Sequence, residues 1–170
     1  MVCDEEGSVW PDVLQKAPGR GAYVCWGKCL SRLSGKQLHA AWKDRLVGAD
    51  QADELCRRSV VALLRLCRQY VHRGVSIGRD AVMHRMWAHA PVLVVLARDA
   101  GEALKRQISE ACAKREGAGL KVTCVPFDGS SLLGELLERE KVSVLAIDKT
   151  SANEKWLQYC MWYEQLQKTE

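Results

Sequence analysis

The run Pro91-Val-Leu-Val-Val-Leu-Ala-Arg-Asp-Ala100 is the part of the sequence that decides the fold. Its six consecutive apolar residues, 92–97, are typical of a short strand that is buried on both faces of a sheet. Further strands are predicted on both sides of it, at 75–77, 122–127 and 142–147. Helical patterns alternate with the strands, at 54–72, 79–88, 102–115, 131–139 and 152–167. This alternation predicts an α/β fold, a three-layer α/β/α sandwich around a small, mostly parallel sheet.

The first part of the chain has a different pattern and predicts a separate small α+β module over residues 1–47. Val2-Cys3 and Ser8-Val9-Trp10 flank an acidic turn that ends in Gly7, which predicts a short hairpin. A loop at 16–21 and a short strand at 22–25 should follow, and then one or two short helices that end near Arg45. Residues 47–53 are interpreted as a linker that ends in a helix N-cap, and the second module extends over 54–168.

The basic residues are unevenly distributed along the chain. The whole chain has 25 Lys and Arg against 21 Asp and Glu, but residues 14–47 contain seven bases and one acid, and residues 57–89 contain seven arginines and one acid. Such segments are typical of proteins that bind a polyanion, although a solvated surface is the alternative. With no apolar run of about 20 residues and no signal peptide, we expect a soluble cytoplasmic protein.

The helix predicted at 54–72 combines one apolar half with a basic face. A helical wheel at 100° per residue places four arginines on the side opposite the leucines, with Val61 as the misfit. Because a guanidinium matches the geometry of a phosphate, this face is either solvated or contacts nucleic acid phosphates. The four residues are Arg57, Arg58, Arg65 and Arg68.

The eight cysteines do not predict a disulfide framework or a metal site. Several lie inside apolar helical or strand patterns, where cysteine acts as a small hydrophobic residue. Cys25 and Cys29 are four residues apart, but a zinc site needs four ligands, and Cys3 and His39 form only a loose second pair. We therefore expect no metal and no cofactor, with Cys25 and Cys29 as the weak metal candidates.

The loop Lys16-Ala-Pro-Gly-Arg-Gly-Ala-Tyr-Val-Cys25 combines flexible glycines, positive charge and an aromatic ring, which suits nucleic acid. A structural turn would explain the glycines equally well. Together with Cys29-Leu30 and the basic helix after it, this string resembles the YlxR family of small bacterial proteins, which is associated with RNA. The family's first cysteine pair has no counterpart here, so we expect the module to be truncated at its start. The RNA contacts expected in this module are Lys16, Gly19, Arg20, Gly21, Tyr23 and Arg32.

The second module resembles the ribosomal-protein family that binds kink-turns, including its YlxQ-like branch. The matching blocks are 74–82, 91–100 and 142–148. The resemblance implies an α/β/α sandwich and RNA contacts at three places, which are Gly78, Arg79, Asp80 and His84, then Arg98 and Asp99, then Lys149 and Thr150. A helix that begins at Gly78 would offer its first N–H groups to a phosphate. Asp80 and Ala81 stand where kink-turn readers carry Asn-Glu, so the resemblance implies RNA binding more firmly than kink-turn specificity.

The last helix carries an apolar stripe that is interpreted mainly as core. Because Trp162 lies off this stripe, the helix is apolar beyond one face, and homo-oligomerisation through its aromatic residues is also an expectation. These residues are Trp156, Tyr159, Trp162 and Tyr163.

The sequence contains none of the common catalytic motifs, among them His-Glu-x-x-His, Gly-x-Ser-x-Gly and the dinucleotide glycine fingerprint. We therefore expect a non-enzymatic bacterial protein that binds structured RNA, with ribosomal or RNase P RNA as candidates, in translation or RNA processing. The alternative is a protein-interaction adaptor or dimerisation scaffold that uses the α/β/α domain without RNA specificity. Steep salt dependence would separate the two, because RNA binding releases counterions.

Overall fold

The computed structural model describes residues 1–19, 21–25, 28–47, 51–70 and 74–168, and within them the fold is mixed α/β, as predicted. The described part of the chain contains no helix that is both long and apolar enough to cross a membrane. The chain divides into two compact units, the first comprising Met1–Leu66 and Trp162–Glu170 and the second Cys67–Met161. The module ranges 1–47 and 54–168 stay a prediction.

The first unit begins with the predicted hairpin. Strands β1 (Val2–Cys3) and β2 (Val9–Trp10) pair antiparallel around the acidic turn. Gly7 in this turn has a φ of 80°, and a Cβ added to it would lie 2.2 Å from the carbonyl oxygen of Arg45. Only glycine fits there, because the hairpin and the segment after Arg45 approach each other closely. The other elements of this part of the chain are α1 (Lys28–Ser31), α2 (Gly35–Trp42), the 3-10 turn η1 (Lys43–Arg45) and the start of α3 (Gln51–Tyr70).

Two predictions for the first unit are wrong. Residues 22–25 form no strand. Gly21 makes an isolated bridge to Val2 and Ala22 exchanges two hydrogen bonds with Met1, but no ladder continues through the described residues 23–25. Helix α3 begins at Gln51 rather than at Glu54, so the expected cap lies inside the helix. The Gln51 side chain explains the earlier start, since its carbonyl oxygen accepts the backbone N–H of Val9 and its amide donates to the Val47 carbonyl.

The second unit is built on a four-stranded sheet with the order β3-β6-β4-β5. Its strands are β3 (Ser76–Ile77), β4 (Val92–Ala97), β5 (Val122–Phe127) and β6 (Val144–Asp148). The expectation of a mostly parallel sheet is wrong, because only β4 and β5 pair in parallel, whereas β6 is antiparallel to both of its neighbours. Helix α5 (Glu102–Gly117) returns the chain to the starting end of the sheet, but the seven-residue helix α6 (Ser130–Leu136) does not, so β6 runs backwards.

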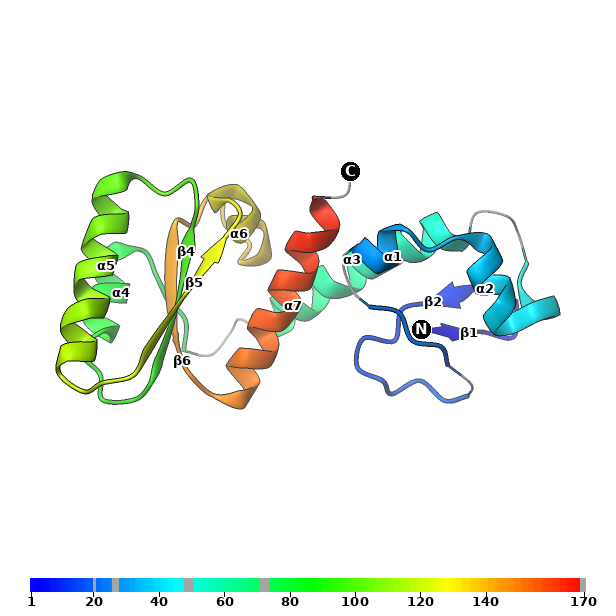
Figure 1. Cartoon of the computed structure of the whole chain (residues 1–170), viewed down its shortest axis with the longest axis horizontal. Helices are drawn as coiled ribbons and strands as arrows, with labels where there is room; N and C mark the ends of the chain where they lie inside the picture. Colours follow the sequence, from blue (N-terminus) through cyan, green and yellow to red (C-terminus); the bar gives the residue numbers. More distant parts are fainter. Residues whose placement is uncertain (20, 26–27, 48–50, 71–73, 169–170) are drawn as a thin grey trace. The chain divides into compact units, whose positions relative to one another are not determined.

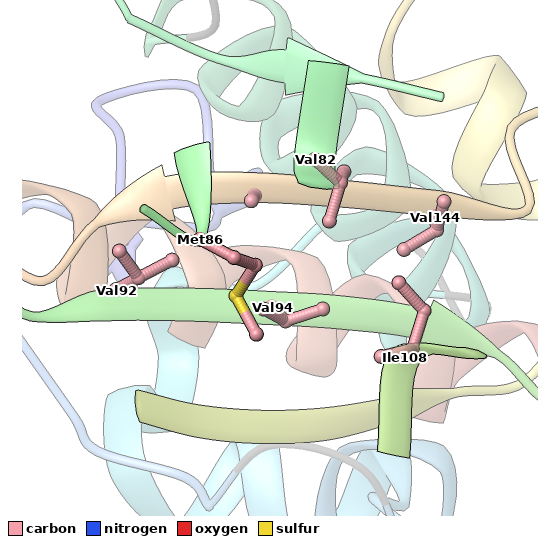
Figure 2. Close-up of a cluster of buried hydrophobic side chains, with 7 residues drawn as sticks. Val82, Met86, Val92, Val94, Ile108 and Val144 are labelled. Carbon is pink, nitrogen blue, oxygen red and sulfur yellow. The ribbon is translucent and has the colours of Figure 1, made fainter. Parts of the chain in front are cut away.

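Helices cover both faces of this sheet. Helices α4 (Arg79–Arg85) and α5 lie on one face, and α6 lies on the other (Figure 1). Val82 and Met86 pack with Ile108 of α5 against Val92, Val94 and Val144 of the sheet, and all six are nearly or fully buried (Figure 2). The alternate strand residues that point to the opposite face are also buried, among them Leu93, Val95, Leu145 and Ile147. The central strand is therefore buried on both faces, as its six apolar residues predicted.

Several helices and strands of the second unit begin or end at residues other than those predicted. Helix α4 stops at Arg85 rather than residue 88, because the guanidinium of Arg115 binds the carbonyls of Met86 and Ala88 in the turn that follows. Helix α6 ends at Leu136 rather than residue 139, where Glu138 takes a φ of 56°. Strand β6 starts at Val144 rather than residue 142, and the last helix, α7, spans Ser151–Gln167.

Candidate nucleic-acid interface

The first unit exposes three of the side chains that were predicted to contact RNA. Lys16, Tyr23 and Arg32 are exposed, and Tyr23 retains 84% of its accessible surface. The loop that carries Lys16 and Tyr23 is held by the carboxylate of Asp12, which accepts the backbone N–H of Lys16 at 2.9 Å, and by the bridge from Gly21 to Val2. Gly19 has a φ of 99° and Arg20 lies outside the described residues. The loop therefore presents a tyrosine ring and a lysine to solvent.

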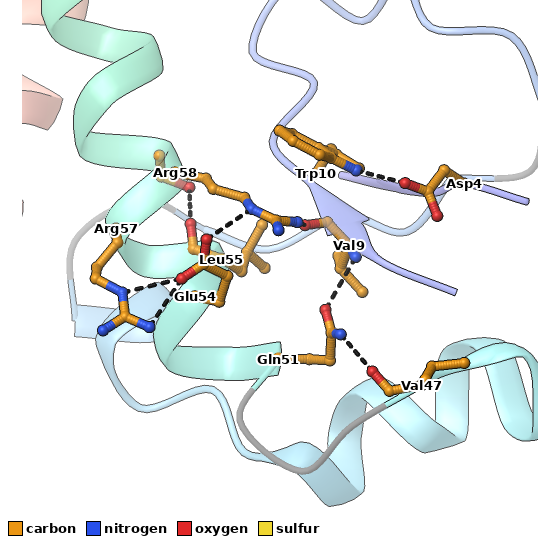
Figure 3. Close-up of polar contacts among 10 residues, drawn as sticks. Asp4, Val9, Trp10, Val47, Gln51, Glu54, Leu55, Arg57 and Arg58 are labelled. Carbon is orange, nitrogen blue, oxygen red and sulfur yellow. Dashed lines mark hydrogen bonds and ion pairs between the residues drawn. The ribbon is translucent and has the colours of Figure 1, made fainter. Parts of the chain in front are cut away.

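The four arginines of α3 do not form one free face. Arg57 and Arg65 are exposed, whereas Arg58 and Arg68 are partly buried and bind other parts of the chain. The Arg58 guanidinium donates to the Val9 carbonyl at 2.9 Å and to Glu54 at 2.9 Å (Figure 3). It also lies over the ring of Trp10, 3.9 Å from the ring centroid. Arg58 thus holds the hairpin against α3. Its positive charge interacts with Glu54 and the Trp10 ring inside the first unit, and the side chain does not extend freely toward solvent.

In the second unit, the strand register brings two of the predicted segments together. The backbone N–H of Gly78 donates to the Val144 carbonyl at 3.0 Å, and that of Ala97 donates to the Ser143 carbonyl at 2.9 Å. The segments that begin at Gly78 and Arg98 therefore meet at one end of the sheet, where β3 and β4 finish and β6 starts. Gly78 has a φ of 87°, a conformation that favours glycine.

The segment between α6 and β6 joins the same end of the sheet, although the sequence interpretation did not select it. The N–H of Val142 donates to the Ser130 carbonyl, and Glu138 pairs with Arg68 at 3.8 Å. A mainly polar pocket of about 280 Å³ opens here, with Arg68, Glu138 and Arg139 in its wall. We call this region the cationic end of the sheet, and its basic side chains are Arg68, Arg79, Arg98, Arg139 and Lys141.

Acidic neighbours equal these cations in number. They are Asp80, Asp99, Asp128, Glu138 and Glu140. Arg79 pairs with Asp80 at 2.8 Å, and Arg98 pairs with Asp128 at 3.2 Å. In both pairs the arginine side chain is more than half exposed, and exposed ion pairs contribute at most about 1 kcal/mol. A phosphate that binds such an arginine can replace the carboxylate at low cost.

Asp99 has a structural role at this end. Its carboxylate accepts the backbone N–H of Ser130 at 2.8 Å and the Ser130 hydroxyl at 2.7 Å. The hydroxyl bond is the main cause of a pKa below the usual value for Asp99, and the charge of Lys141 acts in the same direction. Asp99 therefore fastens the loop after β4 to the first residue of α6.

The other predicted contacts of the second unit lie elsewhere. Residue Asp148 pairs with Val92 at the start of β4, so Lys149 and Thr150 lie at the opposite end of the sheet from Arg98. The Lys149 backbone donates to the Pro91 carbonyl at 2.7 Å, and its ammonium pairs with Glu154 at 3.7 Å. His84 is exposed on α4. Two of the three predicted RNA-contact segments therefore converge, and the third does not.

A sequence signal for the missed segment exists. The run Glu138-Arg139-Glu140-Lys141 is a dense cluster of charge between a predicted helix and a predicted strand, and Gly134 precedes it by four residues. A Cβ on Gly134 would lie 2.7 Å from the Arg139 carbonyl oxygen, so the glycine allows the segment to fold back over α6. A glycine inside a helix, a few residues before a charged turn, can therefore indicate that the turn packs closely against that helix.

The cysteines and the last helix add little to the site. Cys25 and Cys29 are exposed, and the described residues contain no group of three or more His, Cys, Asp or Glu side chains that could hold a metal ion. In α7, Trp156, Tyr159 and Tyr163 are buried, which confirms the interpretation of the stripe as core. Trp162 is partly exposed, and homo-oligomerisation through this helix stays a prediction.

Comparisons with known proteins give only distant likenesses. No protein-family model and no curated protein matches the chain. Among solved structures, a Bacillus halodurans protein of unknown function is similar, with 19% identity, a TM-score of 0.45 and coverage of 58% of this chain and 96% of that one. The Giardia lamblia 15.5kD RNA binding protein is similar with 18% identity, a TM-score of 0.42 and coverage of 64% and 89%.

Proposed function

We propose that this protein binds structured RNA through the cationic end of the sheet, without catalysing a reaction. The proposal is supported by the convergence of four segments of the chain at one place. Arg68 and Arg79, then Arg98, and then Arg139 with Lys141 come to one end of the sheet through the strand register. The resemblances noted in the sequence favour ribosomal or RNase P RNA as the ligand, with a role in translation or RNA processing.

The chemistry of these side chains suits a phosphate backbone. A guanidinium can bind two phosphate oxygens at once, and four of the five cations here are arginines. Folded RNA is recognised largely by shape and by contacts to its phosphates and riboses. A rigid sheet end that holds several arginines at fixed positions matches a fixed arrangement of phosphates better than a flexible tail would.

The first unit supplies a second contact in this proposal. Its exposed loop presents Lys16 for a phosphate and Tyr23 for stacking on an unpaired base. A base stacked on an aromatic ring contributes about 1–3 kcal/mol to binding. The exposed Arg32 adds a further positive charge to this unit.

Binding of a structured RNA panel over a salt series tests the proposal. The double variant Arg98→Ala with Arg139→Ala should weaken binding at least tenfold, because it removes two phosphate contacts. It should also reduce the slope of log affinity against log salt by about 0.7–0.9 for each lost contact. The control is Lys155→Ala, which removes an exposed lysine in the first turns of α7, at the opposite end of the sheet. It should change the affinity less than twofold.

Two results would contradict the proposal. The first is no measurable affinity for any structured RNA at low salt. The second is binding that Arg98→Ala with Arg139→Ala leaves unchanged. Retained structure in the variants would be checked by circular dichroism, since both arginine side chains are exposed and carry no core contact.

A further inference from the structure

A second and larger pocket lies in the same unit, along helices α4 and α5. Its volume is about 510 Å³, within the range of about 300–1,000 Å³ that is typical of small-molecule sites. Met86 forms part of its lining and also belongs to the buried cluster between these helices and the sheet (Figure 2). The floor of the pocket is therefore part of the packed core of the second unit. Its lining is mainly apolar, including Met83, Met86, Trp87, Ala111, Ala118 and Leu120.

The most unusual wall of the pocket is Trp87. Its side chain remains 74% exposed, although tryptophan is one of the side chains that gain most from burial. It lies two residues after the end of α4, in a turn where Arg115 binds the carbonyls of Met86 and Ala88 on both sides of it. A flat, exposed indole on a fixed turn is a ready stacking surface for another aromatic ring.

The charge of the pocket favours an anion. Arg79, Lys114 and Arg115 line it, and Glu110 is its single carboxylate. Arg115 is only 4% exposed, and its guanidinium donates to the carbonyls of Met86, Ala88, Ala90 and Lys121. These acceptors are neutral backbone carbonyls, and none of the four is a carboxylate. The positive charge of Arg115 therefore borders the pocket, where four carbonyl oxygens and Glu110 screen it in part.

Polar groups along α5 complete the lining. Gln107 and Glu110 are exposed and border the pocket one turn apart, and Lys114 follows one turn after Glu110. The amide of Gln107 both donates and accepts, and the carboxylate of Glu110 accepts from amino or hydroxyl groups. An aliphatic ligand would make no hydrogen bond with these groups, whereas the edge of a base or a ribose would.

We propose that this pocket binds a nucleotide, with its base stacked on Trp87 and its phosphate held by Lys114. The nucleotide is either free or an unpaired residue of an RNA strand, since both present the same base and phosphate. The proposal does not rest on RNA binding at the cationic end of the sheet. Arg79 belongs to both regions and is therefore left unchanged in the test.

Titration of the full-length protein with AMP, GMP, CMP and UMP tests the pocket directly. At least one should bind with a dissociation constant below about 1 mM and should quench tryptophan fluorescence. Trp87→Ala should weaken its binding at least tenfold and abolish the quench, whereas Trp87→Phe, which keeps a ring, should lose less. Lys114→Ala should weaken binding several-fold. The control Arg106→Ala removes an exposed arginine that does not line the pocket, and it should leave nucleotide affinity unchanged.

Short single-stranded RNAs of four nucleotides identify the source of the ligand. If they bind much more tightly than mononucleotides and lose that affinity in Trp87→Ala, the pocket takes an unpaired residue of RNA. If they bind no better, it takes a free nucleotide. The proposal is overturned if neither probe binds at millimolar concentration, or if Trp87→Ala binds as the wild type does. Because the cationic end is varied separately, a failure here is distinguishable from a failure of the proposed function.

Discussion

The guanidinium of Arg58 lies 3.9 Å from the centroid of the Trp10 ring and donates a hydrogen bond to the backbone next to it, at Val9. On the other side, Gln51 accepts the N–H of Val9, so two side chains of α3 hold both polar groups of one residue (Figure 3). The hairpin is two residues long on each side and has few ladder bonds of its own. Its stability therefore depends on the first turns of α3.

Arg58→Ala should destabilise the hairpin by about 2 kcal/mol, because it removes a cation–π contact and a charged hydrogen bond that is partly buried. The matched control is Arg57→Ala, one residue away, where the arginine side chain is 71% exposed and contacts only Glu54. It should cost less than about 0.5 kcal/mol. Native-state hydrogen exchange of the Val9 amide measures both effects, and equal protection in the two variants would contradict this role.

Arg115→Ala should be among the most destabilising single changes in the second unit, with a cost of about 3 kcal/mol or more. The guanidinium joins the turn after α4 to the chain before β5 through four carbonyls, all of which would lose their partner. Arg115→Lys should recover only part of the loss, since an ammonium cannot reach acceptors spread around a planar fork. Urea unfolding measures the effect, with the exposed neighbour Lys114→Ala as a control that should lie near the wild type.

The sequence predicted most of the second unit because its signals are local. The apolar run 92–97 matches β4, because a strand buried on both faces needs an uninterrupted series of apolar residues. The run 122–127 matches β5, an edge strand that is only partly buried. The direction of β6 could not be predicted in the same way. It depends on whether α6 is long enough to return the chain across the sheet, and the pattern at 131–139 suggested two more residues than the helix has.

The candidate site was predicted less completely, for a related reason. Gly78 and Arg98 were selected, but the segment at 138–141 was not, because its position depends on the close approach of Arg139 to Gly134. The wheel for α3 placed Arg58 with the free arginines, because a wheel contains no information about Trp10, which lies 48 residues earlier. The burial of Arg115 could not be predicted from the sequence either. Its guanidinium binds backbone carbonyls, whose positions do not depend on a recognisable pattern of side chains.

Asp99→Asn should destabilise the second unit by an amount that depends on pH. The pKa of Asp99 is lowered from 3.8 in the fold, chiefly by the Ser130 hydroxyl, so the charged carboxylate is the stabilising form. The difference in stability between wild type and variant should therefore be constant above about pH 5 and should shrink as the pH falls through the folded pKa of Asp99. Thermal unfolding at pH 3, 4, 5 and 7 tests this, and a difference that grows on acidification would contradict it. Ser130→Ala should reduce the same pH dependence.

Gly134→Ala should destabilise the second unit although it places a better helix former inside α6. The added Cβ would lie 2.7 Å from the carbonyl oxygen of Arg139 and 2.9 Å from that of Glu140, and both atoms are backbone. Displacing them should cost about 1–3 kcal/mol and move the 138–141 segment.

The matched control for Gly134→Ala is Gly117→Ala in α5, where a Cβ would meet nothing within 4 Å. It should be neutral or stabilise by up to about 1 kcal/mol. Denaturant midpoints measure the two changes. If Gly134→Ala also weakens RNA binding at a temperature where the variant remains folded, while Gly117→Ala does not, the effect passes through the position of Arg139 and Lys141. Unchanged RNA affinity in a destabilised Gly134→Ala variant would instead separate that segment from the RNA contact.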